Sequence, residues 1–231
     1  MLTVSHLTKH YGHVAALSDV SFSIRPGEVL GLIGPNGSGK TTLFECLAGV
    51  QPADAGMLLR DGEPVSVRDR SSVLFYMPDG IAPWAHQTVG WVLRYAEGFF
   101  GGPPPGEWAD VFERLDLESL VDVRVGELSK GQRKRVLLAI GLLTPQPVLL
   151  ADEPFDGLDL RQTREVGGAL RLYAATGRTL FLSIHQISDA ARFCDRFVLL
   201  SEGRVCGEGT LDEITGRAKT NTLEDAFLAL T

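Results

Sequence analysis

The segment GPNGSGKT, from Gly34 to Thr41, constrains the fold of this chain more than any other. It matches the G-x-x-x-x-G-K-[ST] pattern of a phosphate-binding loop (P-loop), which requires a strand before it and a helix after it. Both are indicated here, because the apolar run Val29–Ile33 precedes the loop and the helical pattern KTTLFECLAG begins at Lys40. We therefore expect an α/β core that binds a nucleotide.

The chemistry expected of this loop follows from its residue types. Glycines let the backbone curl so that its N–H groups face phosphate oxygens, Lys40 can reach the β- and γ-phosphates, and the Thr41 hydroxyl can bind Mg²⁺. The expected nucleotide contacts in this segment are Gly34, Pro35, Asn36, Gly37, Ser38, Gly39, Lys40, Thr41 and Thr42.

Five short apolar runs predict the sheet of this core. They are VLGLI, VLFYM, VLLA, LFLSI and FVLL, which begin at residues 29, 73, 148, 180 and 197. Continuous hydrophobicity is typical of strands covered on both faces, as in a parallel sheet, and helical patterns separate the runs. The N-terminal segments instead alternate and turn at Pro26–Gly27, which predicts antiparallel strands on one side. The fold class is therefore α/β, with a mainly parallel sheet and an N-terminal antiparallel β sub-domain.

The middle of the chain departs from this alternation of strands and helices. TVGWVLRYAEGFF carries one apolar helical stripe, the Gly/Pro loop 101–106 follows, and EWADVFERLDL predicts a second amphipathic helix. GELSKGQRKRVLLAIGLL predicts a third helix, with Ser129 as its N-cap and buried side chains after Arg135. The stripe of the first helix consists of Val89, Val92, Leu93, Ala96 and Phe100.

We interpret residues 1–231 as a single domain with three parts. The α/β core and its antiparallel sub-domain take residues 1–78 and 146–215, and an inserted helical sub-domain takes residues 79–145. A tail helix is assigned to residues 216–231, with Thr222 as its N-cap, and we expect it to pack against the body.

Composition and charge limit the partners. The chain has 231 residues and a formal net charge of −7, whereas a nucleic-acid binder is expected to be basic. Three cysteines without a C-x-x-C pair fit a reduced, cytosolic protein. The start of the chain lacks the apolar segment of a signal peptide, and no apolar run reaches the roughly 20 residues of a membrane span. We expect a soluble, cytoplasmic chain that binds no nucleic acid.

Polar side chains follow two of the predicted strands. Asp152 and Glu153 end the segment PVLLADE, and His185 follows LFLSI. Together with a P-loop, one carboxylate at a strand end fits a Mg²⁺ site, and a second can orient or deprotonate a water molecule. His185 lies at the edge where sites of α/β proteins form, which makes it a candidate γ-phosphate contact.

A second candidate anion site begins at Ser129. Free N–H groups at a helix start bind anions, and Lys130, Arg133, Lys134 and Arg135 crowd the first turns of this helix. The chain carries one P-loop, however, and the phosphate that this second helix start would bind is not supplied by any other motif.

The motifs GPNGSGKTT, LSKGQRKRVLLA, VLLADEPFDGLD and SIH occur in the order and spacing of the ATPase subunits of ABC transporters, which the chain resembles over nearly its whole length. The resemblance implies a role for each matching residue. Tyr11 corresponds to the aromatic side chain that stacks on adenine. Lys40, Thr41 and Asp152 correspond to phosphate and Mg²⁺ ligands. Glu153 corresponds to the carboxylate that polarises the attacking water.

The remaining matches concern the γ-phosphate and the dimer. His185 corresponds to the switch histidine at the γ-phosphate, and Asp159 to the acid at the dimer seam. In the signature segment LSKGQ, Ser129 and Gly131 correspond to γ-phosphate contacts, and we include Gln132 in the same set. A two-fold dimer would bring the signature of each chain to the P-loop of the other.

The chain departs from the family pattern at several positions. Lys130 replaces the usual glycine in the signature, and Phe155 and Asp156 stand where Thr and Ser or Asn are commoner. Asp79 stands where the family usually has glutamine, and an acid there can still approach Mg²⁺ or water. Subunits of drug and antibiotic exporters share this acidic variant, and the ending LEDAFLALT resembles that group.

The resemblance favours the motor subunit of an ABC exporter, with ATP and Mg²⁺ as cofactors. Its implied partners are a second ATPase subunit, identical or paralogous, and a polytopic membrane permease subunit, which would hold the chain at the inner face of the cell membrane. An importer ATPase and an ABC ATPase acting on nucleic acid or the ribosome are the alternatives. Trp84, Trp91 and Tyr95 either line the groove that receives the permease or belong to the core of the helical sub-domain.

Overall fold

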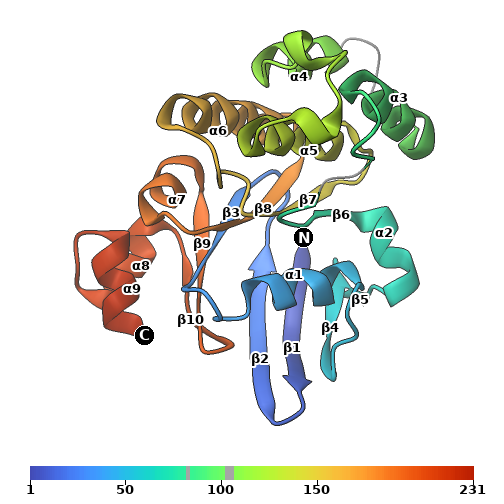
Figure 1. Ribbon diagram of the computed structural model, residues 1–231. Helices are drawn as coiled ribbons and strands as arrows, with labels where there is room; N and C mark the ends of the chain where they lie inside the picture. Colours follow the sequence, from blue (N-terminus) through green and yellow to red (C-terminus); the bar gives the residue numbers. More distant parts are fainter. Residues whose placement is uncertain (82–83, 102–106) are drawn as a thin grey trace.

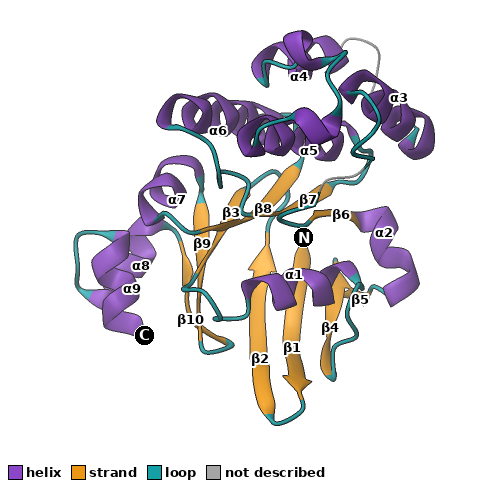
Figure 2. Ribbon diagram, viewed as in Figure 1, coloured by secondary structure: helices purple, strands orange, loops and turns teal. Residues whose placement is uncertain are grey.

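The computed structural model describes residues 1–81, 84–101 and 107–231, which form three layers (Figures 1 and 2). A four-stranded sheet packs on one face of a six-stranded sheet, and helices cover the other face of the six-stranded sheet. Apart from Gly101, the predicted Gly/Pro loop lies outside the described residues.

The six-stranded sheet confirms the prediction of a mainly parallel sheet. Its order is β10-β9-β3-β8-β7-β6, and every neighbouring pair is parallel except β10 with β9. Strands β3, β7 and β8 are buried along their whole length, which explains their continuous apolar sequences. The strands are β3 Val29–Ile33, β6 Leu74–Met77, β7 Val148–Asp152, β8 Thr179–Ile184, β9 Arg196–Ser201 and β10 Arg204–Gly209.

The four-stranded sheet contains the alternating N-terminal segments and is antiparallel, as predicted, in the order β2-β1-β4-β5. The turn at Pro26–Gly27 leads from β2 into β3 of the other sheet, whereas β1 and β2 are joined across Gly12. Helix α1 (Lys40–Ala48) contributes Leu43, Phe44 and Leu47 to the core between the two sheets. The strands are β1 Leu2–Tyr11, β2 Val14–Ile24, β4 Ala55–Arg60 and β5 Glu63–Pro64.

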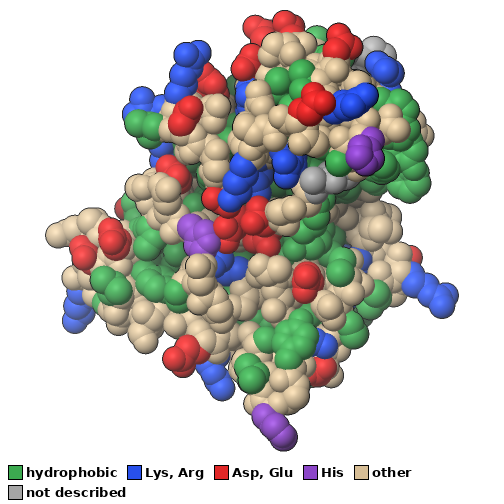
Figure 3. Space-filling model, viewed as in Figure 1, with side chains coloured by type: hydrophobic (Ala, Val, Ile, Leu, Met, Phe, Trp, Pro, Cys, Tyr) green, Lys and Arg blue, Asp and Glu red, His purple; other side chains and the backbone are tan. Residues whose placement is uncertain are grey.

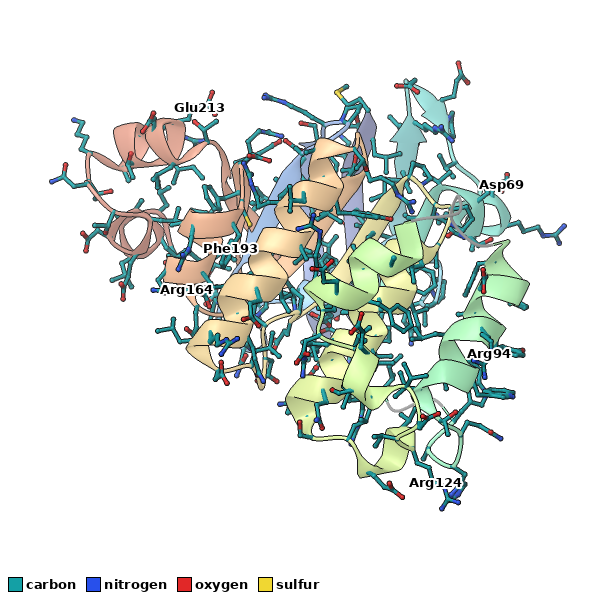
Figure 4. All side chains as sticks on the ribbon, turned by 90° about the horizontal axis from the view of Figure 1, so that it is seen from above. Asp69, Arg94, Arg124, Arg164, Phe193 and Glu213 are labelled. Atoms are coloured by element: carbon teal, nitrogen blue, oxygen red, sulfur yellow. The ribbon has the colours of Figure 1, made fainter. Side chains whose placement is uncertain are left out.

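The helical layer contains the three helices predicted for the middle of the chain, α3 (Val89–Phe100), α4 (Glu107–Arg114) and α5 (Lys130–Leu143), together with α6 (Leu160–Ala175) and α7 (Ile187–Phe193). Seen from above, Arg94 of α3 and Arg124, which precedes α5, lie at the rim of this layer, and Phe193 lies beside α6 (Figure 4). Shorter elements are α2 Arg70–Val73 and the 3₁₀ turns η1 Val67–Asp69, η2 Glu118–Leu120 and η3 Val125–Glu127.

Helix α5 joins the helical sub-domain to the parallel sheet. All its residues from Val136 to Leu143 are buried, as its apolar sequence predicts. Gly141 permits the close approach to β7, because a Cβ atom there would lie 2.9 Å from Leu149 Cδ1. Despite the apolar end of α5, no helix within the described residues has the length and hydrophobicity needed to cross a membrane.

The chain ends in two short helices, α8 (Leu211–Ala218) and α9 (Leu223–Leu230). Thr222 caps α9 by accepting a hydrogen bond from the Asp225 N–H, which confirms the predicted N-cap. Leu223 and Ala226 are buried in the core that includes α7, so this helix packs against the body as expected. The predicted start of the tail at residue 216 falls inside α8.

Candidate nucleotide site

The candidate site lies where three neighbouring parallel strands end. The P-loop follows β3, Asp152 is the last residue of β7, and His185 follows β8. Because β8 lies between β3 and β7, the three motifs reach the same edge of the sheet. Ligands of open α/β sheets bind outside the carboxyl ends of the strands, which makes this edge the candidate nucleotide site.

The P-loop backbone depends on its glycines. Gly37 and Gly39 have φ values of 81° and 104°, a region that favours glycine. A Cβ atom on Gly34 would lie 2.3 Å from the Leu200 carbonyl oxygen, so the loop can approach β9 only without a side chain. Among the described residues, no side chain caps the start of α1 at Gly39. The first N–H groups of α1 therefore remain available to an anion.

Two polar side chains of the P-loop, Lys40 and Ser38, have no acidic side chain as a hydrogen-bond partner among the described residues. The Lys40 Nζ atom donates hydrogen bonds to the carbonyl oxygens of Gly34 (2.8 Å) and Pro35 (3.2 Å), which leave its charge uncompensated. Burial lowers the pKa of the Lys40 ammonium, although the charges of Glu153 and Asp152 oppose this shift. The Ser38 hydroxyl is buried without a hydrogen-bond partner among the described residues. A phosphate group would satisfy both side chains.

Asp152 is held between two hydroxyl groups. The Thr41 hydroxyl donates to Asp152 Oδ2 at 2.8 Å, and the Ser183 hydroxyl donates to Asp152 Oδ1. Ser183 stands directly opposite Asp152 in the pairing of β7 with β8 and is fully buried. Its hydroxyl also accepts a hydrogen bond from the Glu153 N–H at 2.9 Å. The sheet therefore fixes the carboxylate that the sequence assigns to Mg²⁺ next to the P-loop threonine.

Glu153 points in a direction of its own because its backbone leaves the strand conformation. Its φ of 52° is uncommon for a residue with a side chain, and such strain occurs at functional sites. Its Oε1 atom lies 2.6 Å from His185 Nε2. Burial raises the pKa of the Glu153 carboxyl group and Asp152 adds to this, whereas His185 and Lys40 oppose it. The predicted catalytic pair is thus in direct contact.

Asp79, which we predict as a further acid able to approach Mg²⁺ or water, is paired with a lysine. Lys134 Nζ lies 2.6 Å from Asp79 Oδ1. Burial favours the neutral acid, but the hydrogen bond and charge of Lys134 outweigh it and lower the pKa of Asp79. Asp79 also groups with Glu153 and Asp156, whose carboxylate oxygens lie within 4.8 Å of its own and of one another.

The signature segment begins α5 with a capping box. The Ser129 hydroxyl accepts from the Gln132 N–H at 3.2 Å, and Gln132 Oε1 accepts from the Ser129 N–H at 2.9 Å. Gly131 is buried and packs closely against the loop after β7, since a Cβ atom at this position would lie 2.9 Å from the Gly157 carbonyl oxygen. Ser129 itself is exposed, so the structure leaves one face of this helix start accessible.

Tyr11 and Asp159 lie away from these contacts. Tyr11 ends β1 with an exposed ring, and Lys9 Nζ lies 5.3 Å from the centre of that ring. Asp159 is the N-cap of α6, where its side chain accepts from the Gln162 N–H at 2.8 Å. Both remain available, one for an adenine ring and the other for a dimer contact, but neither prediction is tested by the single chain.

Two functional candidates were missed from the sequence, Ser183 and Lys134. Ser183 precedes His185 by two positions on β8, and the hydroxyl in an otherwise apolar run was the available signal. Lys134 was counted among the basic residues of α5, and only the fold reveals that its ammonium is buried beside Asp79.

The donor set fits ATP with Mg²⁺. The glycine-lined loop, the open start of α1, the unpartnered Ser38 hydroxyl and the Lys40 ammonium, which binds only carbonyl oxygens, suit a phosphate chain. Thr41 and Asp152 supply the oxygen ligands that Mg²⁺ prefers, already in mutual contact. The residues present therefore can hold this cofactor pair.

Comparison with known proteins agrees with this chemistry. Residues 17–156 match the family model described as "ABC transporter". The Nod factor export ATP-binding protein I of Burkholderia orbicola (strain AU 1054) is 36% identical over 212 residues, which cover 88% of this chain and 69% of that protein.

Solved structures of similar fold cover nearly the whole chain. The ATP-binding subunit of an ABC transporter matches with a TM-score of 0.89 and 28% identity, covering 100% of this chain and 99% of the other. A dimeric structure of the bacterial ABC transporter cassette MJ0796 matches with a TM-score of 0.80 and 24% identity over 91% of this chain and 99% of that one, which is evidence for the fold alone.

Proposed function

This chain belongs to the ABC transporter family, and we propose that it is the ATP-binding, ATP-hydrolysing subunit that powers an exporter through a separate membrane subunit. Its ATPase class follows from the family, and export is supported by relatives whose names specify export. The observation that carries the proposal is the contact between Glu153 and His185 beside the hydroxyl-held Asp152 and the P-loop.

The residues of the site divide the work of hydrolysis. The N–H groups of the P-loop and of the start of α1 bind the phosphates, and Lys40 exchanges the carbonyl oxygens of Gly34 and Pro35 for phosphate oxygens. Mg²⁺ held by Thr41 and Asp152 neutralises phosphate charge when bound.

Glu153 orients the attacking water and accepts its proton, because its carboxylate stands free of the strand and in contact with an imidazole. His185 keeps this carboxylate in place through the Nε2 contact and lies where it can meet the γ-phosphate. Positioning and electrostatic stabilisation, rather than covalent chemistry, then lower the barrier to phosphoanhydride hydrolysis.

A second copy or a paralogue completes each site. The structure of the similar cassette MJ0796 is dimeric, and the exposed Ser129 with the N–H groups at the start of α5 suits a phosphate held by a partner. Among the described residues of the single chain, no hydrogen bond joins the signature segment to the P-loop. The phosphate-binding side of the P-loop is therefore open to the signature segment of a second subunit.

The aromatic cluster of Trp84, Trp91, Tyr95 and Phe99 is our proposed docking site for the membrane subunit. Trp84 and Tyr95 are each 45% exposed, which argues against a place in the sub-domain core for these two rings. Trp91 is partly buried against the core, and its ring stacks on Tyr95 with 5.2 Å between the ring centres. Trp84, Tyr95 and Phe99 border an apolar hollow of about 270 Å³ between β6, α3 and α5, and such a patch on a protein surface favours a partner. Docking there would hold the chain at the inner face of the membrane.

Substituting Trp84 with glutamate tests this function in the native organism. A tagged wild-type chain should co-sediment with membranes, whereas Trp84→Glu should lose at least about tenfold of this association, because an aromatic anchor is replaced by a charge. The purified variant should keep its basal ATPase rate. Leu228→Glu, at an exposed apolar position on α9, is the matched control and should behave as wild type. Equal membrane association of both variants would refute the docking site.

A further inference from the structure

Two lysines on one face of α5 bind acids from two different loops of the core. Lys130 and Lys134 are four residues apart and therefore neighbours on the helix surface. Lys130 Nζ lies 2.5 Å from Asp156, in the loop after β7, and Lys134 Nζ lies 2.6 Å from Asp79, in the loop after β6. We call these two ion pairs the lysine clasp.

The acids of the clasp flank the catalytic carboxylate. Carboxylate oxygens of Asp79, Glu153 and Asp156 lie within 4.8 Å of one another, and crowded like charges repel unless cations compensate them. In Figure 3, acidic side chains gather at the middle of the visible face, with basic side chains directly above them and a histidine beside them. Lys130 and Lys134 are thus the resident cations of this cluster.

Lys134 is the stronger half of the clasp because it is buried. Its side chain is 3% exposed, and its ammonium also donates to the Asp152 carbonyl oxygen at 3.5 Å. A buried ammonium is costly unless it is paired, so removal of either partner leaves an uncompensated charge. Through the Lys134 ammonium, α5 therefore contacts both the loop after β6 and the end of β7.

Lys130 is more exposed, but its stem adds a packing contact. A Cβ atom on Gly157 would lie 2.8 Å from the Lys130 Cγ and Cδ atoms, so the lysine stem lies directly on this glycine. The next residue, Gly131, approaches the Gly157 carbonyl oxygen with similar closeness. The first turn of α5 thereby rests on the loop that leads away from Glu153.

We propose that Lys130 and Lys134 are positioning residues that hold the signature segment in register with Glu153 within one chain. Neither lysine contacts the P-loop in the described structure, so the clasp should affect turnover and not ATP affinity. The inference rests on the proposed ATPase function. Lys130 and Asp79 both depart from the family pattern. Each takes part in an ion pair that links the helical sub-domain to the core.

The first test separates binding from turnover in the Lys130→Met/Lys134→Met double variant. The Kd for a fluorescent ATP analogue should stay within about twofold of wild type, whereas kcat should fall about tenfold, as expected when catalytic groups are misplaced. Lys134→Arg, which retains the charge, should recover most of kcat.

Arg161→Met is the matched control, because it removes an exposed ion pair with Glu165 on α6 and should leave both the Kd and kcat unchanged. An unchanged kcat in the double variant would overturn the proposal, as would parallel changes in Kd and kcat.

The second test distinguishes the ion pair from a general loss of stability. Exchanging the charges of the outer pair, Lys130→Asp with Asp156→Lys, should restore kcat relative to Lys130→Asp alone, because the attraction is kept while the residues are swapped. Failure of the swap to restore any activity would argue that side-chain packing, not charge, sets the position of α5.

Amide hydrogen exchange of the nucleotide-free protein tests the lysine clasp independently of ATP hydrolysis. Amide exchange of residues 129–135 in the nucleotide-free protein should be about fivefold faster in the double methionine variant than in wild type. Unchanged exchange would overturn the clasp whether or not ATP is hydrolysed. Absence of ATP hydrolysis by the wild type would instead overturn the proposed function, and the exchange data would still decide on the clasp.

Discussion

At the scale of single residues, Glu153 combines an uncommon backbone conformation with a carboxyl group whose pKa its surroundings shift. Its φ of 52° turns the carboxylate out of β7, and the Glu153 N–H is bonded by Ser183, so the unusual backbone is supported by a side chain of the neighbouring strand. Burial raises its pKa, and His185 limits the rise. Protonation and geometry at this residue are therefore linked.

The pH dependence of hydrolysis follows from this linkage. The active form is the carboxylate, so kcat should fall as the pH drops through the raised pKa, at a higher pH than an ordinary glutamate would give. His185→Ala removes the electrostatic interaction that lowers the pKa of Glu153, so it should move this acid limb to still higher pH, besides lowering kcat. We would measure kcat against pH for both proteins. His86→Ala, at an exposed position, should keep the wild-type limb. A shift of the His185→Ala limb to lower pH would contradict this assignment.

Ser183 gives a second prediction at this scale. Ser183→Ala removes the hydroxyl that bonds both Asp152 and the Glu153 N–H, so the Mg²⁺ requirement of kcat should rise about tenfold, the usual cost of losing a partner that orients a ligand. Titration of kcat with Mg²⁺ measures this, and Ser183→Thr should retain part of the effect. A Mg²⁺ titration identical to wild type would show that Ser183 does not position Asp152.

At the scale of elements, close packing at glycines sets how the helices sit. Gly167 of α6 meets the buried ring of Phe193 at the end of α7, where a Cβ atom on the glycine would lie 2.3 Å from the ring. Gly167→Ala should therefore lower the free energy of unfolding by about 1–3 kcal/mol through overpacking. Gly168→Ala, one position along and with nothing within 4 Å, should be neutral or stabilise by up to about 1 kcal/mol. Denaturant unfolding compares the two, and equal stabilities would refute this packing account.

The elements themselves were largely predictable from the sequence, but their side-chain partners were not. Continuous apolar runs identified β3, β7 and β8 because both faces of these strands are buried, and Ser129 marked the start of α5 by its capping chemistry. The pairing of Asp79 with Lys134 joins residues 55 positions apart, and no local pattern encodes such a contact. The sequence therefore predicted a role for Asp79 near Mg²⁺ but not its lysine partner.

At the scale of the whole molecule, one chain holds two halves of different sites. The P-loop, Asp152, Glu153 and His185 converge at one sheet edge because neighbouring strands end there, which the sequence predicted from the motifs. The signature segment begins a separate helix, and its exposed Ser129 contacts Gln132 rather than the P-loop. A complete catalytic site therefore requires a second subunit.

The most direct test of this requirement is the association state of Glu153→Gln with and without MgATP. The substitution removes the group that activates water but leaves the P-loop intact, so bound ATP should persist. By light scattering, we predict a monomer without nucleotide and a dimer containing two ATP molecules with it, together with a loss of at least about 100-fold in kcat. A Glu153→Gln protein that binds ATP yet stays monomeric, or that hydrolyses ATP at the wild-type rate, would contradict the account.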